Sequence, residues 1–235
     1  MRIGLVPYKY INNDVEYNIG QIEKALNESL DKVDLLCFGE SFLQGFDSLR
    51  WNYEADKDIA ITSDAPEMKK LRQWSKDYNT AILFGYIERD GNRIYSSCAV
   101  MHEGELICNY RRISTGWKES SKTDEHYQEG TDIKTFELKN KKISIVLCGD
   151  LWEYPDRFKT DKLLIWPVYV NYNLNEWIIE EKEYATQAGD IAKEVLMINS
   201  LSDDPVSHGG AFYFKEGKVA DRITFDSEEI LIVDV

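Results

Sequence analysis

Glu40 and Cys148 are of the residue types that cooperate in nucleophilic catalysis, and each follows an apolar run. Glu40 lies in CFGESFLQGF directly after VDLLCF (33–38), and Cys148 lies in ISIVLCGDLW. A carboxylate beside a buried strand is partly desolvated and suits a general base. A thiol followed by glycine can present its sulfur and the next backbone N–H to one ligand. These residues suggest a Cys148 nucleophile with an oxyanion donor at Gly149.

Each of these features also has a purely structural interpretation. Glu40 can be a loop- or helix-capping glutamate, and Cys148 can be a buried structural cysteine. The basic run at 110–112 is typical of a solvated sheet edge, which charged residues protect from aggregation. The other cysteines lie in apolar runs and are expected to be small buried hydrophobic residues. These other cysteines are Cys37, Cys98 and Cys108. No group of Cys and His residues in the sequence has the spacing of a zinc site.

The segments around these residues alternate between strand and helix patterns, which predicts an α/β fold. Unbroken apolar runs predict strands buried on both faces, and turn dipeptides such as Asp90-Gly91 predict hairpins over 88–112. The polar, aperiodic stretch 114–130 is expected to be a long loop. The strands are expected at 2–7, 33–38, 80–88, 142–150, 162–170 and 195–201, and the helices at 15–31, 66–78 and 174–192. Gly209-Gly210 is expected to form a turn, and three more strands are expected after Gly209.

Composition limits the classes of partner. Hydrophobic residues make up 43% of the 235-residue chain, enough for one sizeable core. The net charge of -14 argues against nucleic acid and anionic membranes, since phosphate binding requires a basic surface. No run approaches the roughly 20 apolar residues of a membrane span, and MRIGLVPY lacks the pattern of a signal peptide. We therefore expect a cytoplasmic protein.

In order and context, these segments resemble the nitrilase superfamily of carbon–nitrogen hydrolases, whose members pair a glutamate, a lysine and a cysteine at strand ends. VDLLCFGESFLQGF is similar to the segment with the base glutamate, although Gly39 stands where proline is usual. GYIERDGNRIYSSCAVMHEGELICNYRR is similar to the stretch before the lysine. ISIVLCGDLWEYPD resembles the nucleophile segment with one residue more than its commonest form, and GGAFYFKEGKV resembles a late hairpin. The resemblance covers nearly the whole chain.

The resemblance implies a four-layer αββα sandwich in a single domain, residues 1–235, and a homodimer or higher homo-oligomer assembled through the sheet-flanking helices. It also implies that Glu40 takes the proton from Cys148, whose thiolate attacks the carbon of a small-molecule amide or nitrile. Ammonia or an amine then leaves, and water hydrolyses the thioester. This chemistry requires no metal and no organic cofactor.

The chain departs from the family pattern at the lysine, because Tyr-Arg-Lys is here Tyr110-Arg111-Arg112. Arg112 keeps a positive charge and several donors, so it can support an oxyanion, but it is effectively never deprotonated and cannot relay a proton. Lys118, a few residues later, is a second candidate for this role. Many members also have a second glutamate in the following loop, for which Glu125 in TDEHYQEG is the best match and Glu129 an alternative.

These residues lead to one main hypothesis and two alternatives. The main hypothesis is an amidase that acts on a small linear amide through a Cys148 thioester. The first alternative is a nitrilase-like protein that binds a ligand or partner without turnover, because of Arg112. The second is acyl transfer, in which an amine takes the place of water. Several aromatic residues fall in segments that can line the pocket: Trp117, Trp152, Tyr154, Tyr169 and Tyr172.

Overall fold

The computed structural model describes all 235 residues, and two six-stranded sheets form its centre. In each sheet the middle strands are parallel and the flanking strands antiparallel. The first sheet has the order β12 (Leu231–Asp234), β1 (Arg2–Leu5), β2 (Leu35–Cys37), β3 (Ala81–Asp90), β4 (Arg93–His102), β5 (Glu105–Arg111). The second has the order β11 (Lys218–Ile223), β10 (Val206–Lys215), β9 (Glu194–Asp203), β8 (Leu163–Val168), β7 (Lys141–Ile145), β6 (Thr135–Leu138).

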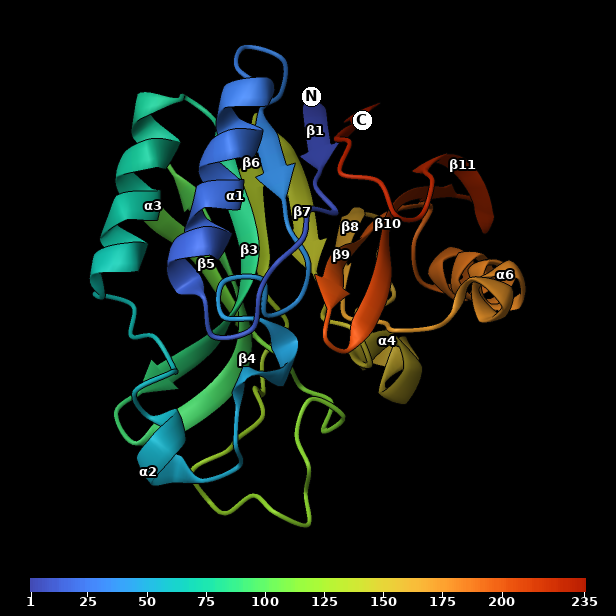
Figure 1. The fold of residues 1–235 in the computed structure, drawn as a ribbon. Helices are drawn as coiled ribbons and strands as arrows, with labels where there is room; N and C mark the ends of the chain where they lie inside the picture. Colours follow the sequence, from blue (N-terminus) through green and yellow to red (C-terminus); the bar gives the residue numbers. More distant parts are fainter.

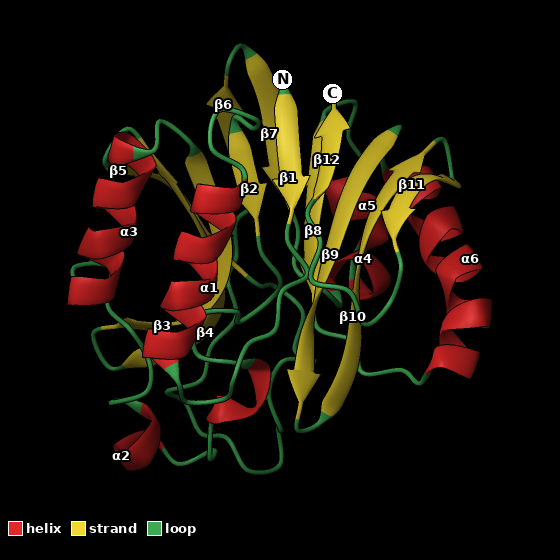
Figure 2. Ribbon diagram, turned by 45° about the horizontal axis from the view of Figure 1, so that its top comes forward, coloured by secondary structure: helices red, strands yellow, loops and turns green.

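Helices cover the outer face of each sheet, so that the chain forms the expected four-layer αββα sandwich (Figures 1 and 2). Helices α1 (Val15–Glu28) and α3 (Pro66–Asp77) pack on the first sheet, and α6 (Leu174–Ile191) packs on the second. Four short helical segments lie in connections: η1 (Phe46–Ser48), α2 (Tyr53–Asp56), α4 (Asp150–Glu153) and α5 (Pro155–Phe158). The termini lie side by side in Figure 1 because β1 pairs with β12.

Local sequence explains where several elements begin and turn. Pro66 occupies the first turn of α3, as predicted, where its missing N–H has no helical partner. Asn173 and Glu176 form a capping box that begins α6. The β4–β5 turn uses Glu103-Gly104, with φ of 50° and 85°. Such left-handed turns match the twist of the strands that they join.

Most predicted elements are present, with three differences. The strand expected at 142–150 ends at Ile145, although the N–H groups of Val146 and Cys148 still donate to the carbonyls of Ile165 and Pro167 in β8. Strand β6 was not predicted. Gly209-Gly210, expected to form a turn, lies inside β10 at an irregularity opposite β9, where both residues have positive φ.

No helix of the chain is long and apolar enough to cross a membrane. The expected cytoplasmic location stays a prediction.

Candidate active site

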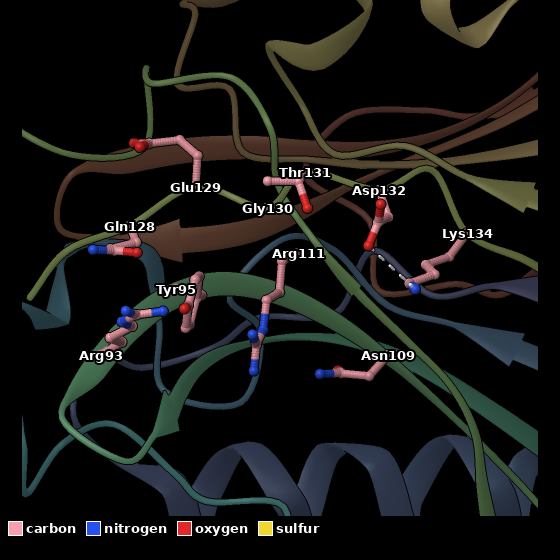
Figure 3. A pocket seen from close by; sticks show the side chains of 10 residues that line it. All are labelled: Arg93, Tyr95, Asn109, Arg111, Gln128, Glu129, Gly130, Thr131, Asp132 and Lys134. Carbon is pink, nitrogen blue, oxygen red and sulfur yellow. Dashed lines mark ion pairs between the residues drawn. The ribbon is translucent and has the colours of Figure 1, made fainter.

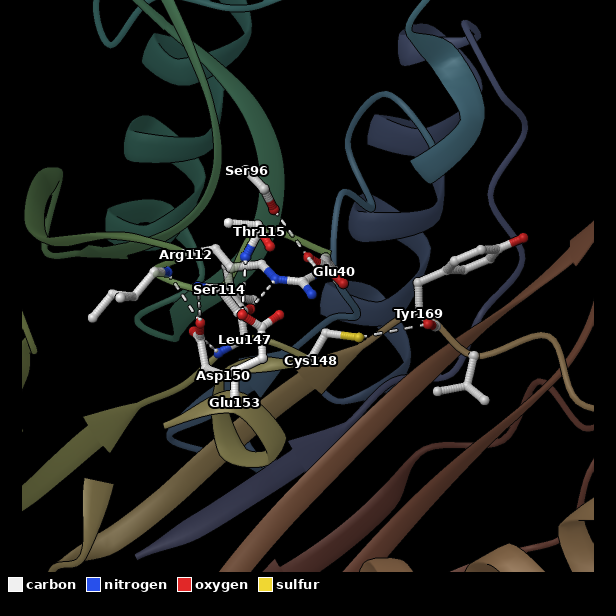
Figure 4. A network of polar contacts seen from close by, with 12 residues as sticks. Glu40, Ser96, Arg112, Ser114, Thr115, Leu147, Cys148, Asp150, Glu153 and Tyr169 are labelled. Carbon is white, nitrogen blue, oxygen red and sulfur yellow. Dashed lines mark hydrogen bonds and ion pairs between the residues drawn. The ribbon is translucent and has the colours of Figure 1, made fainter. Parts of the chain in front are cut away.

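Three polar side chains from the two sheets meet where the strands end (Figure 4). Glu40 follows β2 and Arg112 follows β5, both in the first sheet, whereas Cys148 follows β7 in the second. Nη1 of Arg112 donates to Oε1 of Glu40 at 2.9 Å, and the two side chains are 3% and 0% exposed. The structure therefore brings together three of the four predicted catalytic residues.

Glu40 is held in place from both its side chain and its backbone. Ser96 Oγ donates to Oε1 at 3.0 Å, and the Glu40 N–H donates to the Val168 carbonyl across the sheets at 3.3 Å. Oε2 is buried and has no partner in the chain. Gly85 permits this packing, because a Cβ there would lie only 2.7 Å from the Glu40 Cα. One carboxylate oxygen is thus committed to structure, and the other is free to accept a proton.

Cys148 occupies a strained turn that presents its thiol to Glu40. Its φ of 37° lies in the left-handed region, which non-glycine residues adopt at a cost and which often marks functional sites. Trp166 Nε1 donates to the Cys148 carbonyl at 2.9 Å, and Sγ contacts the Tyr169 carbonyl at 3.7 Å. Burial raises the pKa of the thiol to about 12, and the negative charge of Glu40 adds to this, while Arg112 opposes it. The resting sulfur is therefore protonated at neutral pH and requires a base.

The guanidinium of Arg112 bridges the two halves of the centre. Its Nε donates to Ser114 Oγ at 2.7 Å, and Nη1 donates to Glu40. Burial has the largest single effect and lowers the pKa of Arg112, but the charges of Glu40, Cys148 and Asp150 together with the Glu40 hydrogen bond raise it further, so the pKa rises and the group remains a cation. Nη2 lies beside the residue after the nucleophile, since a Cβ on Gly149 would be 2.5 Å from it. Nη2 can thus reach an oxyanion that forms at Cys148.

Asp150 fixes the loop after β5 to the nucleophile turn. Its buried carboxylate accepts four hydrogen bonds, from Tyr110 Oη and from the backbone N–H groups of Ile113, Ser114 and Leu147. This residue sets the position of Arg112 relative to Cys148. The only sequence signal for Asp150 is its place two residues after Cys148 in the segment that resembles the nucleophile motif. Ser96 and Ser114 were missed, because a serine in or after a strand has no distinguishing pattern.

The other candidate residues lie outside this centre. Glu125 is exposed in the loop 114–130 and makes no contact with Glu40, Arg112 or Cys148, so its catalytic role stays a prediction. Lys118 Nζ pairs with Glu129 Oε1 at 2.6 Å and donates to the Tyr127 carbonyl, rather than to the centre. Lys118 and Glu129 therefore form an ion pair with each other in the loop.

The predicted pocket aromatics separate into two groups. The Tyr169 carbonyl contacts the Cys148 Sγ. Burial and the charge of Glu180 raise the pKa of Tyr172, and a smaller contribution from Cys148 places Tyr172 near the thiol. Trp152 packs against Trp166, whose ring holds the Cys148 carbonyl. Trp117, by contrast, packs in a separate cluster with Trp51 and Tyr127.

A polar pocket on the outer face of the first sheet is distinct from this centre (Figure 3). Arg111 lies in it and is bound in ion pairs to Glu88 and Asp90, at 2.7 and 2.8 Å. Neither Glu40 nor Cys148 lines it. No group of three or more His, Cys, Asp or Glu side chains in the chain is arranged to hold a metal ion.

A base with one free oxygen, a protonated thiol and a fixed cation are the groups that covalent acyl chemistry requires.

Comparison with solved structures supports the fold. A CN-hydrolase superfamily protein from Xanthomonas campestris superposes with a TM-score of 0.82 at 17% identity, over 99% of this chain and 89% of that one. An amidase from Nesterenkonia sp. gives a TM-score of 0.80 at 16% identity, over 100% and 90%.

Sequence comparison adds the family. A glutamine-dependent NAD(+) synthetase from Thermotoga maritima is 25% identical over 157 residues, which are 65% of this chain and 26% of that protein. The matches cover between 26% and 53% of the length of three curated relatives, two of them glutamine-dependent NAD(+) synthetases and one a hydrolase from Pseudomonas protegens. The model of the carbon-nitrogen hydrolase family matches residues 2–156. The chain therefore belongs to the carbon-nitrogen hydrolase family, within the nitrilase superfamily.

Proposed function

We propose that the chain is an amidase that hydrolyses a small linear amide through a Cys148 thioester. The observation that carries this proposal is the buried Glu40–Arg112 pair, which leaves one oxygen of Glu40 without a partner beside the Cys148 thiol. The Nesterenkonia protein with the same fold is an amidase, and an amide is therefore proposed as the first substrate class.

The first half-reaction begins with proton transfer. Glu40 accepts the thiol proton through Oε2 as Sγ attacks the carbonyl carbon, and the negative charge moves to the carbonyl oxygen. Arg112 Nη2 and the Gly149 N–H donate to this oxyanion. Because the pKa of Cys148 is about 12, the proton moves during attack and not before it. Glu40 then gives the proton to the leaving nitrogen, and ammonia departs as the C–N bond breaks.

The second half-reaction returns the enzyme to its starting state. Glu40 takes a proton from water as the water oxygen attacks the thioester carbon. The C–S bond then breaks, the carboxylic acid leaves, and the proton returns to Sγ. Arg112 takes no part in these proton transfers, since its guanidinium does not deprotonate. An amine in the place of water would give acyl transfer by the same route.

The second candidate function is binding without turnover. Two features of Arg112 favour this alternative. Its guanidinium stands where the family has a lysine, and its closeness to Gly149 narrows the space for a substrate carbonyl. In this case the thiol would still be alkylated, but no amide would release ammonia.

Ammonia release from formamide, acetamide, propanamide and butanamide tests the proposal. The wild type should release ammonia from at least one, and Cys148→Ala should lose at least about a thousandfold in rate, as expected for a lost nucleophile. Cys108→Ala is the matched control, because Cys108 is a buried thiol on β5 outside the centre. Equal rates in wild type and Cys148→Ala would overturn the proposal.

We also propose that the chain forms a homodimer through α6. Ile178 and Ile179 on this helix are 72% and 64% exposed, and exposed apolar clusters often mark interfaces. Sedimentation of the wild type should give twice the mass of Ile178→Glu. A monomeric wild type would refute the dimer without affecting the proposed chemistry.

A further inference from the structure

A second carboxylate, Glu153, lies next to the catalytic guanidinium without pairing with it. The position of a Cβ on Gly116 would be 3.1 Å from Arg112 Nη2 and 3.7 Å from Glu153 Oε1. No ion pair joins the two side chains, so their N and O atoms are more than 4.0 Å apart. Gly116 therefore lies between a guanidinium nitrogen and a carboxylate oxygen, and the space bounded by Gly116, Arg112 and Glu153 is called the slot below.

The backbone on both sides of the slot sets the position of Glu153. Glu153 ends α4, the short helix that follows the nucleophile, and its Oε2 accepts from the Thr115 N–H at 3.4 Å (Figure 4). Oε1 makes no hydrogen bond or ion pair within the chain, and the residue is exposed. A side chain on Gly116 would enter the slot. One oxygen of Glu153 is thus oriented by the protein and the other is left for a ligand.

The net charge around the slot is negative. Arg112 is neutralised by Glu40, with which it forms a buried pair at 2.9 Å. Cys148 is a neutral thiol at pH 7, since its pKa is about 12. Asp150 is buried and turned toward backbone donors. Glu153 therefore supplies the uncompensated charge that a bound substrate meets, and this charge is negative.

We propose that Glu153 determines specificity by selecting amides whose acyl chain bears an amino or other cationic donor group. This inference rests on the proposed amidase function and names its substrate class. The carbonyl oxygen of the substrate would face Arg112 Nη2 and Gly149, and its ammonium group would donate to Glu153 Oε1. An acyl chain with a carboxylate is disfavoured, because it would place two negative charges side by side.

Substrates of matched shape test the inference. Pentanamide and 4-aminobutanamide differ only in whether a methyl or an ammonium group ends the chain, and succinamic acid ends in a carboxylate. The wild type should favour 4-aminobutanamide over pentanamide by about tenfold in kcat/KM, the value of one charge-assisted hydrogen bond. Glu153→Gln keeps the acceptor for the Thr115 N–H but removes the charge, so this ratio should fall toward one. Glu153→Lys should favour succinamic acid.

A matched control separates local charge from net charge. Glu137→Gln, at an exposed position on β6, makes the same change in net charge and should leave the ratio as in the wild type. If pentanamide is hydrolysed and the ratio does not respond to Glu153→Gln, the inference fails while the proposed function stands.

Protection of Cys148 from iodoacetamide gives a readout that does not depend on turnover. 4-Aminobutanamide should protect better than pentanamide in the wild type but not in Glu153→Gln. This result without ammonia release would support the subsite and refute the proposed hydrolysis. Equal protection by the two compounds, or none by either, would overturn the subsite.

Discussion

Arg112 donates from Nη1 to Oε1 of Glu40 at 2.9 Å, and both charged groups are buried at the junction of the two sheets. The pair occupies Oε1 and leaves Oε2 as the available oxygen of the base. Removal of one partner of a buried pair is more costly than the pair is stabilising, because a buried charge is left uncompensated.

Arg112→Met should therefore destabilise the fold by about 3–5 kcal/mol and abolish ammonia release. Arg112→Lys keeps the charge but loses the Nε bond to Ser114, so it should retain most of the stability. Urea unfolding measures the difference between the two variants. Identical midpoints for Arg112→Met and wild type would show that the pair is not formed as described.

The pKa of Cys148 gives a prediction for pH dependence. Iodoacetamide reacts with the thiolate, so with a pKa of about 12 alkylation should rise about tenfold per pH unit from pH 7 to 10 without a plateau. Glu40→Gln removes a charge that raises this pKa, which should make alkylation at pH 9 faster.

The same Glu40→Gln variant should lose about a hundredfold or more in amide hydrolysis, because the base is gone. Peptide mass spectrometry measures alkylation, and Glu137→Gln is the control for a lost carboxylate elsewhere. Slower alkylation of Cys148 in Glu40→Gln would contradict the electrostatic account of the centre.

Asp150→Asn should show how firmly the loop after β5 is attached. Each carboxylate oxygen of Asp150 accepts at least one backbone N–H. In either orientation of the Asn side chain, its NH2 group would therefore face a backbone N–H and leave that donor without an acceptor. We expect a loss of about 3 kcal/mol in unfolding free energy, compared with about 1 kcal/mol for Tyr110→Phe, which removes one bond. Calorimetry measures both. A smaller effect for Asp150→Asn than for Tyr110→Phe would be inconsistent with these contacts.

Gly39 and Ser200 should be coupled. A Cβ on Gly39 would lie 2.5 Å from Ser200 Oγ, a buried hydroxyl with no partner. Gly39→Ala should displace Glu40, with a cost of about 1–3 kcal/mol and slower hydrolysis. Ser200→Ala on that background should restore part of both, which a double-mutant cycle would measure. Simple additivity of the two changes would argue against the contact.

The strands and hairpins could be predicted because their signals are local. Apolar runs such as VDLLCF and turn dipeptides such as Glu103-Gly104 specify elements without reference to the rest of the chain. The prediction failed at Gly209-Gly210, where pairing with β9 keeps two glycines inside a strand. Strand β6 is four residues long with alternating exposure, too short for its pattern to be distinctive.

The site was predictable only in part, for a similar reason. Glu40 and Cys148 follow apolar runs, so their positions at strand ends could be inferred. Arg112 resembled a solvated edge residue, yet it is 3% exposed, because the Cys148–Asp150 turn of the other sheet covers it. No local pattern encodes that contact. The same limit explains why Ser96 and Glu153 were not identified.

The account depends most on a covalent bond at Cys148, which mass spectrometry of the quenched protein tests directly. Wild type mixed with a hydrolysed amide and quenched in acid should gain the mass of the acyl group on the peptide with Cys148, and hydroxylamine should remove it. Glu40→Gln should show a slower gain. Turnover without an adduct at Cys148, or an adduct on Cys37, Cys98 or Cys108 instead, would contradict the account.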